Sequence, residues 1–193
     1  MAVTEFDICN RALRRVRGSV ISSFDDNTTE SNVCGSEYRL LVESILSEYD
    51  WSFARKRVAL DHLAEVPATG WDDYWQLPAD LLTVRGIFLE NGPPIIFERD
   101  QDKIACDYDE SHTLICVYTA SFAESYWPAY FTEVITEAME VVLWQAVAAD
   151  PDMAETRRKH LHQVTMPKAR NRDYAQQTAR QFPPSRLNAV RRL

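Results

Sequence analysis

Glycine is scarce in this chain of 193 residues, with only five copies. None of them belongs to a GxGxxG, GxxxxGK[ST] or GxSxG pattern, the patterns that hold nucleotide phosphates or expose a nucleophilic serine. Nucleotide-binding enzymes of these kinds and esterases therefore lose their usual sequence support.

Cysteine is also sparse, and Cys9, Cys34, Cys106 and Cys116 form no CxxC pair and no regular spacing. Zinc ribbons and dithiol redox sites need such spacing, so the four thiols are expected to be small buried apolar groups in a reducing compartment. Cys106 and Cys116 could face each other across a hairpin, but nothing in the sequence requires a disulfide.

Long apolar runs are missing as well. The longest, "MEVVLWQAVAA", is interrupted by Glu140 and Gln145 and is shorter than the roughly 20 residues that a membrane span needs. Charged side chains at Glu5, Asp7 and Arg11 break any apolar signal-peptide core. We therefore expect a protein without membrane contact that is made and kept in a cytoplasm.

Catalytic and metal-ligating constellations are not evident. His160 and His162 stand two residues apart, and on a helix they would point in nearly opposite directions, so they cannot chelate one metal together. The cluster "DYDESH" contains Asp107, Asp109 and Glu110 but not the glycine and terminal glutamate of a calcium loop, so a charged hairpin tip is favoured over a metal site. No enzyme activity, metal or cofactor is expected.

Charge is unevenly distributed along the chain. Residues 1–154 hold 11 basic and 27 acidic side chains, a balance of −16, whereas residues 155–193 hold 10 and 2, a balance of +8. The chain closes with "SRLNAVRRL", in which Leu187, Val190 and Leu193 recur every third residue. This basic end predicts either contact with nucleic acid or docking onto an acidic protein surface.

Hydrophobic periodicity predicts an α+β fold. Thr4 caps a first helix that ends at Gly18, and a second helix is expected over 29–55. A third helix opens at Pro128 and ends at Asp150-Pro151, and a fourth starts near Asp152. Strands are expected near 57–60, 73–77, 82–90, 94–98, 103–108 and 113–118.

The order of these elements predicts an antiparallel helical bundle of about four helices, formed by residues 1–56 and 121–182, with an inserted antiparallel β domain over 57–120. Residues 183–193 are expected to form an extended C-terminal arm. The third helix has so broad an apolar face that we expect its own bundle or a neighbouring subunit to cover it on more than one side.

Aromatic side chains gather near the two predicted junctions between helices and β segment. They are Trp51, Phe53, Trp71, Tyr74, Trp75, Tyr126, Trp127 and Tyr130. Such residues are typical of a junction core, and contacts between subunits are the alternative.

Four stretches, in the order in which they occur, resemble the tail tubular protein A family of short-tailed bacteriophages, which are head-to-tail adaptors. They are "DICNRALRRVRGSVISSFDD", "YRLLVESILSEYDWSFARKRVAL", "WDDYWQLPADLLTVRGIF" and "PAYFTEVITEAMEVVLWQAVAADP". The most specific pieces are W-x-F-A-x-x-R-x-x-L, which runs from Trp51 to Leu60, and Y-x-x-L-P-x-D-x-L-x-V, which runs from Tyr74 to Val84.

This resemblance implies a structural virion protein of the phage neck. It implies a dodecameric ring between the portal protein and the tail nozzle protein, with genomic DNA passing through the channel without specific binding. It implies portal docking by the C-terminal arm, for which we name Arg186, Leu187, Val190, Arg191, Arg192 and Leu193. Trp127, Tyr130 and Trp144 are named as candidate subunit-interface residues. The competing hypothesis is a nucleic-acid-binding regulator that uses the same arginines on phosphate.

Overall fold

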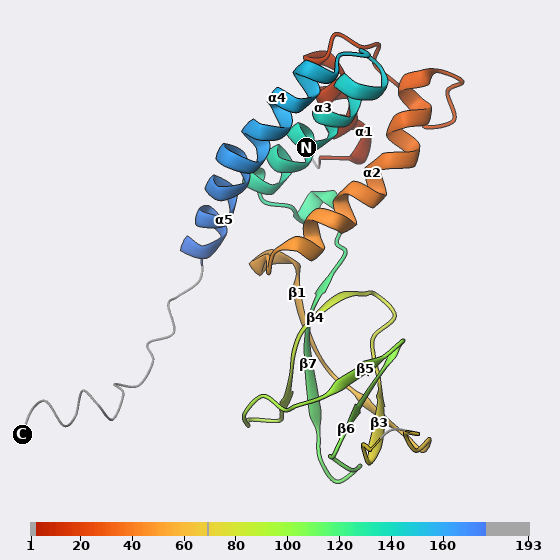
Figure 1. The fold of residues 1–193 in the computed structure, drawn as a ribbon, viewed down its shortest axis with the longest axis vertical. Coiled ribbons are helices and arrows are strands. Elements are labelled where there is room, and N and C mark those ends of the chain that lie inside the picture. Colours follow the sequence, from red (N-terminus) through yellow and green to blue (C-terminus); the bar gives the residue numbers. More distant parts are fainter. Residues whose placement is uncertain (1–2, 69, 177–193) are drawn as a thin grey trace, which may run out of the picture.

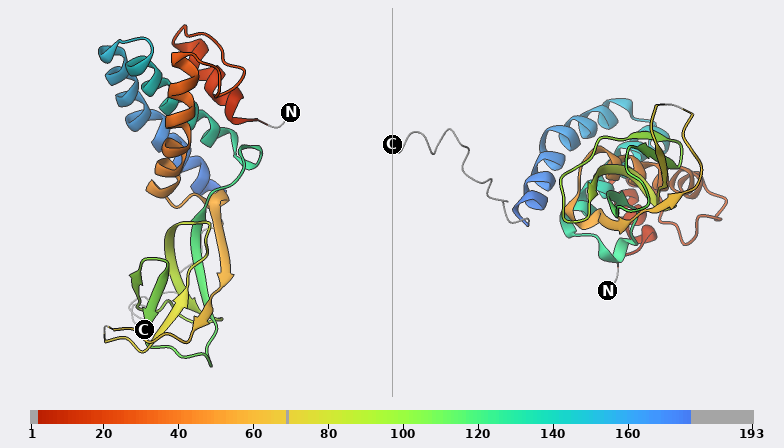
Figure 2. Two further views of the ribbon diagram at one scale, coloured as in Figure 1. Left: turned by 90° about the vertical axis from the view of Figure 1, so that its right-hand side faces the viewer. Right: turned by 90° about the horizontal axis from the view of Figure 1, so that it is seen from below.

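The computed structural model describes residues 3–68 and 70–176, and the predicted arm at 183–193 lies outside them. These residues form an α+β fold in which all seven strands lie between the second and third helices of the chain (Figure 1). The helices and the strands form two lobes along the long axis, seen most clearly from the side (Figure 2). We call them the helical part and the β part.

The first two helices begin where polar caps were predicted. The α1 helix, Glu5–Arg15, starts with a capping box between Thr4 and Asp7, and its end carries the hydrogen-bond pattern of a Schellman motif, with Gly18 N donating to Leu13 O at 2.9 Å. The left-handed backbone at this end belongs to Arg17, with φ of 61°. Gly18 therefore ends the helix as predicted, but it is not the residue with positive φ.

The second helix, α2, spans Thr29–Glu48 and is shorter than the predicted 29–55. Tyr49 already has an extended backbone, and a separate 3₁₀ turn, η1, follows at Ser52–Ala54. The buried Trp51 indole donates to Ile45 O at 2.9 Å, which folds the chain back against the helix end. Apolar residues continue at helical spacing through this bend, which is why periodicity overran the true end.

Two antiparallel sheets make up the β part. One has the strand order β1-β7-β4, with β1 at Arg55–Ala59, β7 at Leu114–Ala120 and β4 at Leu81–Leu89. The other has the order β2-β3-β6-β5, with β2 at Asp61–Leu63, β3 at Asp73–Gln76, β6 at Lys103–Cys106 and β5 at Glu98–Asp100. Because β1 and β7 are paired neighbours, the chain enters and leaves the β part side by side.

The predicted strand at 94–98 is wrong, and the short strand β2 was not predicted. Two prolines occupy 93 and 94, and proline has no N–H to donate to a ladder. This segment instead runs along the edge of β4 through a single bridge between Phe88 and Pro94 and a hydrogen bond from Ile95 N to Ile87 O at 2.9 Å. The regular strand β5 begins only at Glu98.

Each part has its own apolar core, the helical one around Leu13, Leu46 and Phe131 and the other around Ile87 and Leu114. All four cysteines are buried, as predicted, and their thiols are free. Cys106 and Cys116 both lie in the β core, but β6 and β7 belong to different sheets, so the expectation that they face each other across a hairpin is wrong.

The third helix, α3, spans Ala129–Ala146 after Pro128 and is almost wholly buried. Helices α1, α2 and α4 of the same chain pack against it, so its own bundle supplies the cover that its broad apolar face predicted. No described helix is long and apolar enough to span a bilayer.

After α3 the chain reverses into α4, Pro151–His160, which continues through a π-helical turn, η3, at Leu161–Thr165 into α5, Met166–Ala175. Counted as one helix, this α4–α5 unit gives the described residues four long helices, the predicted number. It lies on one side of α3, with α2 on the other (Figure 1).

Candidate interaction surfaces

The α4–α5 helix is held to the molecule by buried carboxylates more than by apolar packing. Its buried apolar side chains are few, namely Ala154, Leu161, Met166 and Ala169. Three buried acidic groups compensate, Glu137 and Glu140 on α3 and Asp173 on α5. Each is a charge that must be paired or hydrogen-bonded to be tolerated away from water.

Glu140 links three helices through the last turn of α4. Its side chain is only 1% exposed and meets Arg157 of α4 at 3.1 Å and Arg15 of α1 at 3.4 Å. Arg15 is also 2.7 Å from Glu133, which pairs with Arg11 at 3.1 Å. This network ties both α1 and α4 to α3.

Glu137 lies beside the π-helical turn. It contacts His160 Nδ1 and accepts a hydrogen bond from Thr165 Oγ1. His160 immediately precedes the π-helical turn, and Thr165 is the last residue of the turn. The His160 side chain is still 51% exposed beside this contact, and His162 is exposed as well. The wider turn thus brings two polar side chains of the outer helix onto one buried acid.

Asp173 fixes the far end of the helix at the junction of the two parts. It is fully buried and accepts hydrogen bonds from Ser52 N at 3.0 Å, Ser52 Oγ at 2.8 Å and Tyr130 Oη at 2.8 Å. Burial, and then the hydrogen bond to Asp173, raise the pKa of the Tyr130 hydroxyl above its ordinary value. The described chain therefore ends at a defined place beside the β part.

The junction contains a second polar anchor, Arg85 of β4. Its Nη2 donates to Tyr49 O at 2.8 Å and to the carbonyls of Leu46 and Ser47 at 3.3 Å, and its Nε donates to Thr119 Oγ1 at 2.8 Å. These carbonyls are the free acceptors at the end of α2. The only early sign of this role was a lone arginine within the apolar run "LLTVRGIFL".

The three aromatic residues named as subunit-interface candidates differ in burial. Trp127 and Tyr130 are each 8% exposed and lie in the helical core, where Trp127 stacks edge-on against Phe131 and Tyr130 binds Asp173. Trp144 is half-buried, and its indole lies 3.4 Å from Glu140 Oε1. Packing within one chain accounts for the first two, and a subunit contact by any of the three stays a prediction.

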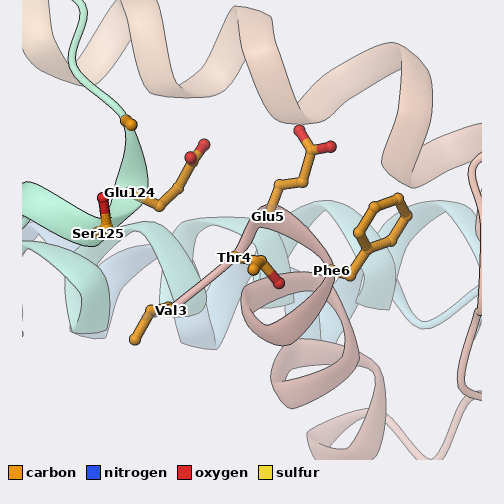
Figure 3. A pocket seen from close by; sticks show the side chains of 7 residues that line it. Val3, Thr4, Glu5, Phe6, Glu124 and Ser125 are labelled. Carbon is orange, nitrogen blue, oxygen red and sulfur yellow. The ribbon is translucent and has the colours of Figure 1, made fainter. Parts of the chain in front are cut away.

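A groove opens where α1 begins, bounded by η2, the 3₁₀ turn Glu124–Tyr126, and by α2. Two adjoining hollows of about 460 and 240 Å³ share Glu5 and Glu124 in their lining. Both carboxylates project toward the α2 side of the groove (Figure 3). Burial, and then the charge of Glu124, raise the pKa of Glu5. The α2 side of the groove also contains Arg39 and Glu43, which pair with each other at 2.8 Å.

The acidic cluster 107–110 lies in the connection between β6 and β7, but these strands belong to different sheets, so the predicted hairpin tip is wrong. Asp109 accepts from Ser111 Oγ at 2.5 Å and contacts His112 Nδ1 at 2.9 Å. These bonds, led by that of Ser111, lower the pKa of the Asp109 carboxyl. Across the described part of the chain, no three His, Cys, Asp or Glu side chains are grouped so as to hold a metal ion.

The predicted portal-docking residues, Arg186 to Leu193, lie outside the described residues. Comparison of the sequence with known proteins found neither a matching family model nor a matching curated protein. The function must therefore be argued from the residues themselves and from the resemblance in the sequence.

Proposed function

We propose that this chain is a structural subunit of a short-tailed phage, a ring-forming adaptor that joins the portal to the tail nozzle and lines part of the DNA channel. The observation that carries the proposal is the position of the two stretches that most resemble the adaptor family. They meet in space, because Asp80 in the second lies 2.6 Å from Lys56 Nζ in the first and accepts from Tyr118 Oη at 2.9 Å.

The first stretch forms the connection between α2 and the strands, and the second runs from β3 into β4. Trp51 opens the first stretch, is fully buried and packs edge-on against Phe131 of α3 with ring centroids 5.1 Å apart. Leu60 closes it and lies in the β core. The resemblance therefore falls on residues that hold the two parts together, which supports a shared architecture of a helical bundle, 1–56 and 121–182, with an inserted β domain, 57–120.

Charge supports a conduit. Residues 1–154 carry a balance of −16, and an acidic lining repels phosphate and avoids the counterion release that makes DNA adhere to basic surfaces. The basic C-terminal segment would dock onto acidic portal subunits, where arginine can form bidentate pairs with carboxylates. In this proposal the protein has no catalytic role, binds no cofactor and resides in the virion neck.

Electron microscopy of the purified chain, alone and mixed with portal rings, tests the adaptor role. We expect portal rings to gain an added layer with twelve-fold symmetry, and we expect Arg186→Glu/Arg191→Glu/Arg192→Glu to prevent this addition without loss of folding. Portal rings that gain no layer from the wild-type chain would contradict the adaptor role.

A gel shift with duplex DNA at two salt concentrations separates the adaptor from a nucleic-acid-binding regulator. The adaptor should bind DNA weakly at both concentrations. Tight binding that falls steeply with salt, and that disappears when residues 183–193 are deleted, would favour the regulator instead.

A further inference from the structure

The α4–α5 helix carries several exposed basic side chains, of which Arg158 and Lys159 pair with Glu155. Arg158, Lys159, Lys168 and Arg172 are all exposed. Lys168 and Arg172 make no ion pair with any described residue, and they border a hollow of about 200 Å³ between α5 and α3. Tyr174, also on this helix, is 63% exposed.

The groove at the start of α1 has the opposite charge. Glu5 and Glu124 form no ion pair within residues 3–68 and 70–176. Among the described residues, the Glu124 carboxylate accepts one long hydrogen bond, from Tyr38 Oη at 3.3 Å. The wall also includes the apolar side chains of Val42 and Trp127 and the ion pair between Arg39 and Glu43. The groove therefore holds more carboxylates than cations, and it offers a surface for the stems of long basic side chains.

These two surfaces cannot meet within one chain, because α3 separates α4–α5 from α2 and the groove beside it (Figures 1 and 2). Two copies arranged head to tail can bring them together. Two different patches on one chain give a heterologous contact, which forms a ring when the successive rotations return to the first copy and a helical filament when they do not.

We propose that Lys168 and Arg172 of one copy bind the groove of a second copy, pairing with Glu5 and Glu124 there. This contact would be the subunit interface of the proposed adaptor ring, and the number of copies in the ring is taken from that proposed function. Its opposite charges would orient the two copies and speed their encounter, and its strength would fall with added salt.

Two charge-reversed chains test the contact. The first carries Lys168→Glu/Arg172→Glu and the second Glu5→Lys/Glu124→Lys. Each alone places like charges across the contact and should associate at least about tenfold more weakly than the wild-type chain. A 1:1 mixture restores opposite charges at every contact, so sedimentation velocity should show assemblies that neither chain forms alone.

Matched controls address folding and general charge effects. Arg57→Glu/Glu110→Lys reverses two exposed charges of the β part and should associate like the wild-type chain. Circular dichroism must show that all variants fold, and Glu5→Gln/Glu124→Gln replaces the lysine variant if lysine near the α1 N-terminus unfolds the helix. Single variants that associate normally, or a mixture that fails to recover, would overturn the contact.

Zero-length carbodiimide cross-linking of mixed light and ¹⁵N-labelled wild-type chains gives an independent readout. We expect cross-links from Lys168 to Glu5 or Glu124 in peptides that combine both isotopes. A wild-type chain that neither associates nor forms these cross-links overturns the inference, yet addition of the same chain to portal rings would leave the adaptor role standing. If the mixture of charge-reversed chains assembles but the wild-type chain does not bind portal rings, the contact between copies stands and the adaptor role is contradicted.

Discussion

Replacing Asp173 with asparagine should loosen the end of the C-terminal helix. The carboxylate is fully buried and accepts from Ser52 N, Ser52 Oγ and Tyr130 Oη. Asparagine keeps the shape but turns one acceptor into a donor, so at least one of these bonds is lost and two donors face each other. A hydrogen bond to a charged group contributes about 1.5–3 kcal/mol, and relief of the buried charge offsets part of the loss.

We therefore expect Asp173→Asn to lower the free energy of unfolding by about 2 kcal/mol, and Tyr130→Phe by about 1 kcal/mol. Urea unfolding followed by tryptophan fluorescence measures both changes, provided that the slope of the unfolding free energy against urea concentration is the same in the variants and in the wild-type chain. The double variant should lose less than the sum of the two, because both substitutions remove the same bond.

Tyr174→Phe is the matched control, since Tyr174 follows Asp173 on α5 but is largely exposed. It should leave the stability unchanged. Hydrogen exchange locates the effect, because the amides of α5 should exchange faster in Asp173→Asn while those of α1 stay protected. Unchanged stability and unchanged exchange in this variant would refute the anchoring role of the carboxylate.

Three further predictions concern the junction, the β part and the tryptophans. Burial, and then the hydrogen bond to Asp80, raise the pKa of Tyr118 to about 12. The contribution of this tyrosine to folding stability should therefore be complete at pH values below its unfolded-state pKa, near 10, and should fall as the pH rises toward 12. Thermal unfolding of Tyr118→Phe should show a shallower fall in stability over the same pH range. Arg85→Met should lower the free energy of unfolding measured in urea by about 2–4 kcal/mol, because the carbonyls at the end of α2 lose their hydrogen-bond donor. Arg85→Lys should recover part of this loss. Trp127→Ala should cost about 3–5 kcal/mol of folding stability, whereas Trp144→Ala should weaken assembly, measured by light scattering, more than folding; equal losses of assembly and folding for Trp144 would assign it to the core.

Local signals predicted the element starts well. Thr4 and Thr28 cap α1 and α2 through reciprocal bonds with the residue three positions later, and Pro128 precedes α3. Each of these helix starts depends on residues that are neighbours in the sequence, so the local sequence pattern is enough to predict it. The end of α2 depends on Arg85, which is 36 positions beyond Tyr49, and no local pattern could reveal it.

Buried charges were the features that sequence reasoning missed. Glu137 and Glu140 are buried residues of α3, and their spacing of three places them on one side of the helix. Asp173 is the only acidic residue after Glu155. These acidic residues are visible in the sequence, but a charged side chain is usually on the surface. Their partners, namely Ser52 for Asp173, Arg157 for Glu140 and His160 for Glu137, come from distant elements of the chain.

The way in which α4–α5 is attached fits an element that positions something else. Apolar packing is non-directional and tolerates sliding, whereas a buried carboxylate with several donors fixes both the rotation and the axial position of a helix. Glu140 holds the last turn of α4, Glu137 the π-helical turn that follows it, and Asp173 the end of α5. The chain beyond residue 176 therefore starts from a defined point beside the junction, which is what a basic docking segment would need in order to reach the same site on every neighbour.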